Sequence, residues 1–198
     1  TQVAGRFQSR GKSWLRLAPD GERFLALHRP DFRPTLTLHG PRGDLLATLA
    51  ATGSATHAEA DFMADGRIAV LESLASTRLR ILSPDGEEEW ALALAESPLS
   101  AHLGGEIAAG RLIVGLHGRS AAVAKAIEVD LIERRIARSW DGLAPVLGHW
   151  SYGFRTMADR VVPGEPGTQL FLSPQRALLR LDPTTGERTV LLGGKGGD

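Results

Sequence analysis

The chain is built from a repeat that leaves few folds open. Four segments each read as an extended lead-in, a glycine turn, an apolar strand, a second strand, another turn and a final strand. The leading turns hold Gly21, Gly66, Gly110 and Gly167, so successive copies start 45, 44 and 57 residues apart. A period of about 40–50 residues with four strands per copy is typical of β-propeller blades. The repeat therefore predicts an all-β fold, a β-propeller or partial propeller with about four recognisable four-stranded blades.

The two middle strands of each predicted blade are rich in β-forming residues. Examples are "RFLALH" with "TLTLHG" and "RIAVLE" with "RLRILS". Near-continuous apolar sequence suits a propeller because both faces of an inner strand pack against neighbouring blades. Pro-Asp-Gly and Thr-Thr-Gly supply the fixed φ and the positive φ that tight turns need. We place the blades at about 14–51, 55–96, 104–140 and 149–192.

The remaining segments fit the same organisation. Residues 1–13 are expected to form an N-terminal tail or a closing strand, and 193–198 a flexible tail. Only 93–103 and 120–127 could be helical; Pro98 breaks the first, and the second falls where a blade needs a loop. With four recognisable blades, the sequence is compatible with a closed four-bladed ring, a fragment of a larger ring, an open arc that a partner completes, or a larger ring whose other blades are too degenerate to recognise.

Composition excludes several classes of function. Lys plus Arg and Asp plus Glu both number 23, so the chain lacks the basic excess that nucleic-acid binding normally needs. No apolar stretch approaches the roughly 20 residues of a membrane-spanning helix, so we expect a soluble chain with no membrane span. There are no cysteines, which excludes thiolate metal sites and fits any compartment. Localisation stays open, with a periplasmic or extracytoplasmic location favoured.

Three stretches resemble known propeller blades. "ADGRIAVLESLASTRLRILSPDGEE" resembles a blade of the NHL-repeat, six-bladed superfamily, and "GTQLFLSPQRALLRLDPTTGERTVLL" is similar to gluconolactonase-like and quinoprotein-like blades. "LRLAPDGERFLALHR" resembles the TolB-like variant. The resemblance spans about 14–192 and implies the propeller fold. It does not imply one activity, because binding scaffolds and enzymes share such blades.

A row of polar residues suggests a site for a cation or a general base. His57, Glu59 and Asp61 occupy alternate positions, which share one face of a strand. Gluconolactonase-like enzymes hold a divalent ion with Glu, Asp and Asn, but this chain contains no Asn. Glu106 and Asp159 could join Glu59 and Asp61 in a different carboxylate site. The simpler interpretation is that these residues are solvated at a channel rim and hold no ligand.

Aromatic residues gather where the third predicted blade leads into the fourth. Trp140, Trp150, Tyr152 and Phe154 fall in "SWDGLAPVLGHWSYGF". Aromatic anchors on a loop held by a rigid scaffold are typical of protein interfaces, although these residues could instead seal the core.

No catalytic motif is present, so the leading prediction is a non-catalytic propeller-type protein-binding scaffold or accessory subunit with a protein partner and no cofactor. The alternative is a metal-dependent, lactonase-like hydrolase or small-ligand binder, with a divalent metal held by carboxylates at the channel mouth.

Overall fold

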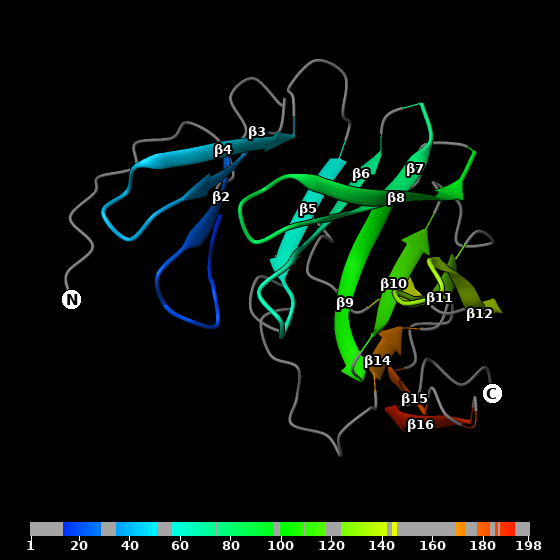
Figure 1. Ribbon diagram of the computed structural model, residues 1–198. Helices are drawn as coiled ribbons and strands as arrows, with labels where there is room; N and C mark the ends of the chain where they lie inside the picture. The colour runs from blue at the N-terminus through cyan, green and yellow to red at the C-terminus, as the bar shows by residue number, and fades with distance from the viewer. Residues whose placement is uncertain are drawn as a thin grey trace. The chain divides into compact units, whose positions relative to one another are not determined.

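The fold is all-β, as the repeat predicts. The computed structural model describes residues 14–28, 35–50, 57–73, 75–96, 100–108, 110–117, 124–141, 144–145, 169–172, 178–182, 185 and 187–192. These residues form four antiparallel sheets of four strands each and contain no helix (Figure 1). Within this described part, no helix is long and apolar enough to cross a bilayer.

Each sheet is a run of four strands in chain order. The first sheet contains β1 (Trp14–Leu17), β2 (Phe24–His28), β3 (Thr35–His39) and β4 (Leu45–Ala50). The second contains β5 (His57–Phe62), β6 (Ile68–Ser73), β7 (Thr77–Leu82) and β8 (Glu88–Ala95). The third contains β9 (Ser100–Ala108), β10 (Arg111–His117), β11 (Ala124–Asp130) and β12 (Arg135–Asp141). The fourth contains β13 (Ala144–Pro145), β14 (Gln169–Leu172), β15 (Leu178–Leu181) and β16 (Arg188–Leu192).

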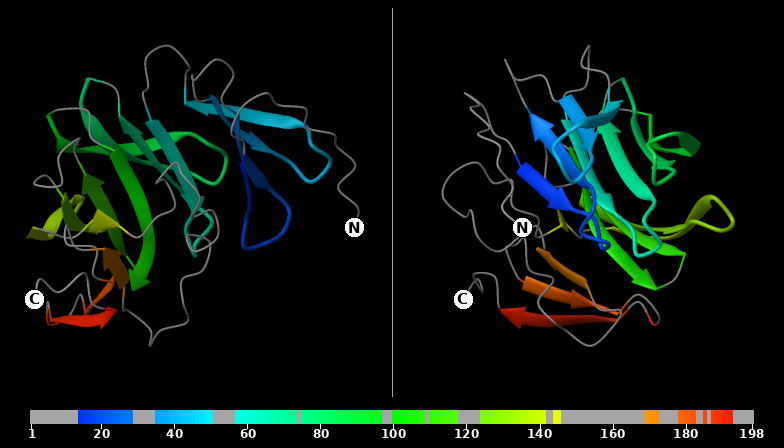
Figure 2. Two further views of the ribbon diagram at one scale, coloured as in Figure 1. Left: turned by 180° about the vertical axis from the view of Figure 1, so that it is seen from behind. Right: turned by 60° about the vertical axis from the view of Figure 1, so that its left-hand side comes forward.

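One boundary differs from the sequence-based expectation. The first strand of the fourth sheet is β13, which lies before residue 149, where the repeat places the start of the fourth blade. The long segment that follows therefore connects β13 to β14 and does not precede the sheet. The chain divides into two compact units, Thr1–Ala101 and His102–Asp198, with the boundary inside β9. The strands of each unit can be followed from two further directions in Figure 2.

The hairpin turns have the backbone geometry that their residues favour. Five turn glycines within the described segments have positive φ: Gly21, Gly43, Gly66, Gly86 and Gly110. The β11–β12 hairpin, which lacks a glycine, instead holds Arg134 at φ 54°. A side chain tolerates this left-handed conformation only at an energetic cost, so the Glu133-Arg134 turn is the strained member of the set.

In the first unit, the first and second sheets share one apolar core. Leu25, Leu27, Leu36 and Leu38 of the first sheet pack with Ala58, Ala60, Ile68, Val70 and Leu82 of the second. All six residues of β6 are buried, because its two faces are both covered. Burying an aliphatic side chain of this size stabilises the fold by about 1.5–3 kcal/mol.

In the second unit, the inner strands of the third sheet are also apolar and buried. Leu112, Val114 and Leu116 alternate with Ile113 along β10, and all four are at most 2% exposed. β13 lies close to β10 and β11. The inner strands are therefore buried on both faces, which explains why they read as continuous apolar runs and not as strict alternation.

Candidate protein interface

The outer strand of the third sheet is exposed along its length. Sheet order ends at β12, which among the described strands pairs with β11 alone. No residue of β12 is buried. A strand at a sheet edge presents backbone donors and acceptors to any chain that can pair with them. Arg135 and Arg138 place positive charge on this edge, which discourages uncontrolled self-association.

Apolar side chains lie on both faces of this edge. A register shift between Glu128 and Val129 places Ile136 opposite Val129 but Trp140 opposite Ala126, so the two point to different faces. Ile136 is 38% exposed, and Ile132 in the preceding hairpin is 77% exposed. Trp140 is half-buried. Two branched aliphatics and an aromatic on one edge are unusual for a solvated strand, and they could anchor a partner.

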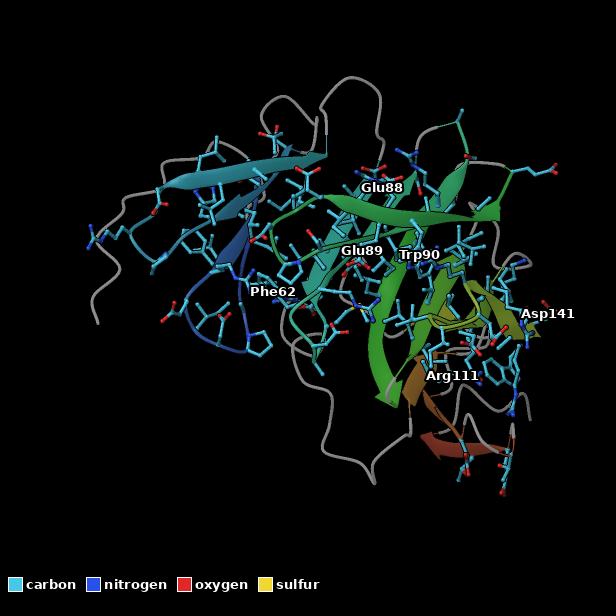
Figure 3. All side chains as sticks on the ribbon, viewed as in Figure 1. Phe62, Glu88, Glu89, Trp90, Arg111 and Asp141 are labelled. Carbon is cyan, nitrogen blue, oxygen red and sulfur yellow. The ribbon has the colours of Figure 1, made fainter. Side chains whose placement is uncertain are left out.

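A cluster of opposite charges lies on the Trp140 face. The register brings Arg138 opposite Glu128 and Arg111 opposite Asp130. Arg111, labelled in Figure 3, donates from Nη1 to Glu128 Oε1 at 2.9 Å, and its Nη2 lies 3.1 Å from Asp130 Oδ2. Glu128 and Asp130 are both nearly buried. Burial of these carboxylates is compatible with folding because arginine charge compensates them.

One atom of this cluster is incompletely satisfied. Glu128 Oε2 is buried and accepts no hydrogen bond from the described residues. Arg138 Nε lies 3.8 Å from it, which is an ion-pair distance but too long for a hydrogen bond. Most buried carboxylate oxygens accept at least one hydrogen bond, so this oxygen leaves the cluster less stable than a fully bonded one.

The surroundings of Asp130 favour its charged form. The backbone amides of Glu133 and Ile132 both donate to Asp130 Oδ1, and the Glu133 bond has the larger effect on the pKa of Asp130. These two hydrogen bonds and the charge of Arg111 lower this pKa, and burial raises it. The net effect is a pKa below the ordinary 3.8. Since the folded pKa is the lower one, ionised Asp130 stabilises the fold above the unfolded pKa and loses this effect as pH falls through the folded pKa.

We expect Asp130→Asn to weaken the dependence of unfolding free energy on pH below about pH 4, since an amide oxygen still accepts from the turn but does not titrate. Urea denaturation of the two proteins between neutral pH and the acid range measures this. An equal acid slope in both proteins would show that Asp130 is not a source of the acid sensitivity.

The second sheet holds a related charged cluster, which faces the first sheet. Glu72, whose side chain is 5% exposed, accepts from Arg80 Nη1 at 2.9 Å and from Arg78 Nε at 2.9 Å. Arg80 also donates to Glu88, labelled in Figure 3, and to the carbonyl oxygen of Leu49 in the first sheet at 2.7 Å. Burial opposes the charged form of Arg80, but Glu88 and Glu72 outweigh it and raise its pKa above the ordinary value. This cluster is a structural clamp between two sheets.

The predicted polar row on β5 has the expected strand geometry. His57, Glu59 and Asp61 lie on β5, alternating with Ala58 and Ala60, which are buried in the core. Asp61 Oδ2 lies 3.9 Å from Arg16 Nε of β1. A neighbouring guanidinium lowers the affinity of a carboxylate for a cation.

Ligand binding by His57, Glu59 and Asp61 stays a prediction. Glu106 lies on β9. The structure describes the backbone but not the side chains of Glu106 and His57, and Asp159 is outside the described residues altogether. Among the side chains that are described, no group of three or more His, Asp or Glu could hold a metal ion.

The aromatic group is only partly visible. The sequence analysis placed Trp140 in the connection between the third and fourth blades. In the structure Trp140 lies within β12, because this strand extends to Asp141. Trp150, Tyr152 and Phe154 fall outside the described residues. Sequence reasoning missed Ile132 and Ile136 as exposed residues, although an apolar residue beside the charged Glu133-Arg134-Arg135 turn was a usable signal. It also missed the Glu72 and Arg80 clamp, which charged residues inside two apolar strands could have indicated.

Comparison with solved structures supports the propeller architecture. A protein of unknown function from Bacteroides caccae matches with a TM-score of 0.57 and 13% sequence identity, covering 89% of this chain and 60% of that chain. BamB from Moraxella catarrhalis, a β-propeller, matches with a TM-score of 0.52 and 14% identity, covering 88% of this chain and 47% of that chain. At these identities the likeness concerns the fold.

The chain spans less than two thirds of either matching structure. No protein-family model matches it, and no curated protein sequence matches it. The fold is thus that of a β-propeller or partial propeller, and a function has to be argued from the chemistry of particular residues.

Proposed function

We propose that this protein is a non-catalytic, propeller-type scaffold or accessory subunit that binds another protein through the β12 edge of its third sheet. The observation that carries the proposal is this edge, where no residue of β12 is buried and where Ile136 and Trp140 lie beside Ile132 of the preceding hairpin. A partner strand could pair with the backbone of β12 while its side chains cover the apolar residues. We propose Trp150, Tyr152 and Phe154, which lie outside the described residues, as further contacts of the same partner. The motif "SPDGEE" supports the further proposal that the blades are related to the NHL type, and "DPTTGE" supports a relation to gluconolactonase-like blades.

The energetics favour Trp140 as the anchor. Interface free energy concentrates in a few large residues, with Trp and Arg over-represented. Trp140 is half-buried in the free protein, so its side chain is already partly ordered and loses less conformational entropy on binding than a freely rotating one. Arg138 occupies the same face and is paired with Glu128, which holds it close to the edge.

The test begins with a photo-crosslinking amino acid at Ile136 of β12, introduced into the chain in the cell that produces it. We expect a covalent adduct with one defined partner. The matched control carries the same amino acid at Ala93 of β8, which is also exposed on the outer strand of a sheet. Adducts of equal yield from both positions, or none from Ile136, would contradict the proposal.

For the partner so identified, we expect Trp140→Ala to raise the dissociation constant roughly 30-fold or more, the effect of losing an anchor of about 2 kcal/mol. Ser139→Ala on the same strand serves as the control and should leave the affinity unchanged. Calorimetry with both variants measures this, and circular dichroism checks the β structure. If Trp140→Ala unfolds the protein, Ile136→Ala provides the same test without a half-buried residue, and unchanged affinity there would overturn the assignment.

A further inference from the structure

The charged cluster of the third sheet exposes its positive groups and hides its negative ones. The side chains of Glu128 and Asp130 are both 6% exposed. Those of Arg111 and Arg138 are 39% and 48% exposed. Arg135 lies opposite Asp130 and is also exposed. Three guanidinium groups thus accompany two carboxylates among these described residues, and the surface that an approaching partner meets is positively charged.

The hairpin before β12 adds another arginine, in a strained conformation. Arg134 has φ 54°, at the turn position that Gly43 and Gly86 occupy in the first and second sheets. A left-handed backbone costs a residue with a side chain about 1–2 kcal/mol, and Arg134 is exposed. Strain of this kind concentrates at functional sites, so the exposed guanidinium is a candidate for contact with a partner.

The strand that pairs with β12 shows which side chains suit this edge. Three consecutive pairs across β11 and β12 alternate between charged and apolar: Asp130 with Arg135, Val129 with Ile136, and Glu128 with Arg138. β11 thus offers an acidic, an apolar and an acidic residue in direct succession. Because the register skips Ala137, the two arginines match carboxylates that are only two residues apart. The side chains of β12 therefore fit a regular strand of alternating acidic and apolar residues.

A partner strand on the outer edge of β12 would meet the same side chains. Successive side chains of an added strand point to opposite faces of the sheet. Those on one face lie beside Arg135 and Arg138, and those on the other face lie beside Ile136. Directly opposite side chains have Cβ atoms about 4.5–5.5 Å apart, and opposite charges at this separation stabilise the pair. The edge therefore distinguishes strands by their charge and by their alternation.

Two other occupants suit this edge less well. The β12 edge of a second copy carries the same arginines, and like charges on paired strands are destabilising. A nucleic acid would match the charge, but a phosphate backbone cannot extend a β-sheet, and the chain as a whole has a net charge of zero. An acidic protein segment suits both the charge and the strand edge.

We propose that the partner segment that binds β12 is extended and acidic, with carboxylates on alternate residues and apolar side chains between them. The inference rests on the proposed function and specifies the chemistry of its partner. In this arrangement two carboxylates lie beside Arg135 and Arg138, and the apolar side chain between them covers Ile136. Arg111 and Arg134 strengthen the positive potential, which speeds the encounter and disfavours basic partners.

Synthetic peptides test this chemistry directly. A fluorescein-labelled peptide of alternating glutamate and valine is the probe, and the same peptide with glutamine at every glutamate is its neutral counterpart. We expect the glutamate peptide to bind the full chain roughly 10-fold more tightly in fluorescence anisotropy, the effect of a few opposite-charge cross-strand pairs. Salt at about 1 M should remove this difference by screening the charges.

Variants that remove charge locate the effect on the chain. Arg135→Gln combined with Arg138→Gln should abolish the preference for the glutamate peptide. The matched control is Arg42→Gln, which removes an exposed arginine from the β3–β4 hairpin of the first sheet and should leave the preference unchanged. Circular dichroism verifies the β structure of each variant. If the double variant unfolds, the comparison of the two peptides on the unaltered chain remains decisive.

The results distinguish this inference from the proposed function. Equal binding of the two peptides, binding of neither, or an equal loss in the Arg42 variant would overturn the acidic preference. So would a short DNA duplex that competes equally well, because it would indicate a general attraction of polyanions. A partner captured from Ile136 whose crosslinked segment lacks alternate carboxylates would refute the acidic segment and leave the scaffold function standing. Selective peptide binding with no capture from Ile136 would support the acidic preference and contradict the proposed function.

Discussion

Replacing Glu72 with Met is expected to lower the free energy of unfolding by about 3–5 kcal/mol, which is the range for removing one partner of a buried ion pair. Glu72 accepts hydrogen bonds from Arg78 and Arg80, and its side chain is 5% exposed. Its loss leaves the largely buried Arg80 with Glu88 as its remaining ion-pair partner and removes charge compensation next to the core of two sheets. Urea denaturation followed by circular dichroism measures the change.

Two further variants separate lost charge from lost packing. The double variant Glu72→Met, Arg80→Met should recover most of the stability, because apolar side chains of similar volume replace a buried pair at little net cost. Recovery should be incomplete, since the Leu49 carbonyl oxygen also loses its bond from Arg80. The control is Glu89→Met, which removes a half-exposed ion pair to Arg67 at 3.5 Å and should change stability by less than about 1 kcal/mol. Equal effects of Glu72→Met and Glu89→Met would refute the clamp.

Replacing Gly86 with Ala should destabilise the protein by about 2–4 kcal/mol, the sum of a left-handed backbone penalty and overpacking. Gly86 has φ +92°, and an added Cβ would lie 3.0 Å from Ala47 Cβ and 2.7 Å from Leu49 Cδ2. Both contacts belong to β4 of the first sheet. The methyl group of Ala47 cannot rotate away, and Leu49 is buried, so the turn itself must move.

Gly43→Ala provides the matched control. Gly43 occupies an equivalent turn at φ +84°, but nothing lies within 4 Å of its added Cβ. We expect the backbone penalty alone, about 1–2 kcal/mol. The difference between the two variants, read from thermal melts and urea curves, measures how tightly the β7–β8 turn packs on β4. The same loss in both variants would mean that packing at Gly86 adds nothing.

Much of the fold could be predicted from short stretches of the sequence. "RIAVLE" and "RLRILS" predict two adjacent inner strands, and β6 and β7 are those strands: β6 is buried throughout, and β7 is buried except at Arg78 and Arg80, which are partly exposed. Pro-Asp-Gly at 84–86 predicts a hairpin, and Gly86 indeed has the positive φ that such a turn requires. Sheet formation here depends on side-chain alternation and turn geometry, which are properties of a few consecutive residues.

Only part of the candidate interface could be predicted from the sequence. The sequence indicates that Trp140 is notable, but not that it lies inside β12, because a strand end depends on pairing with β11. It also cannot separate the faces of Ile136 and Trp140, since the register shift that skips Ala137 of β12 is apparent only once β12 is paired with β11. A one-residue shift moves every following side chain to the other face, so small pairing differences decide which residues a partner meets.

The sequence alone determined the strand periods and turn positions, because these follow from interactions between neighbouring residues, and the recurrence of that pattern along the chain determined the all-β propeller class. The tertiary structure decided which charged groups became structural. Glu72 and Arg80 are eight residues apart on neighbouring strands, and Arg80 also reaches Leu49 in another sheet. Packing between sheets likewise leaves Leu17 of β1 exposed while it buries Leu25 of β2. Burial and charge pairing depend on which surfaces meet, and those meetings involve residues far apart in sequence.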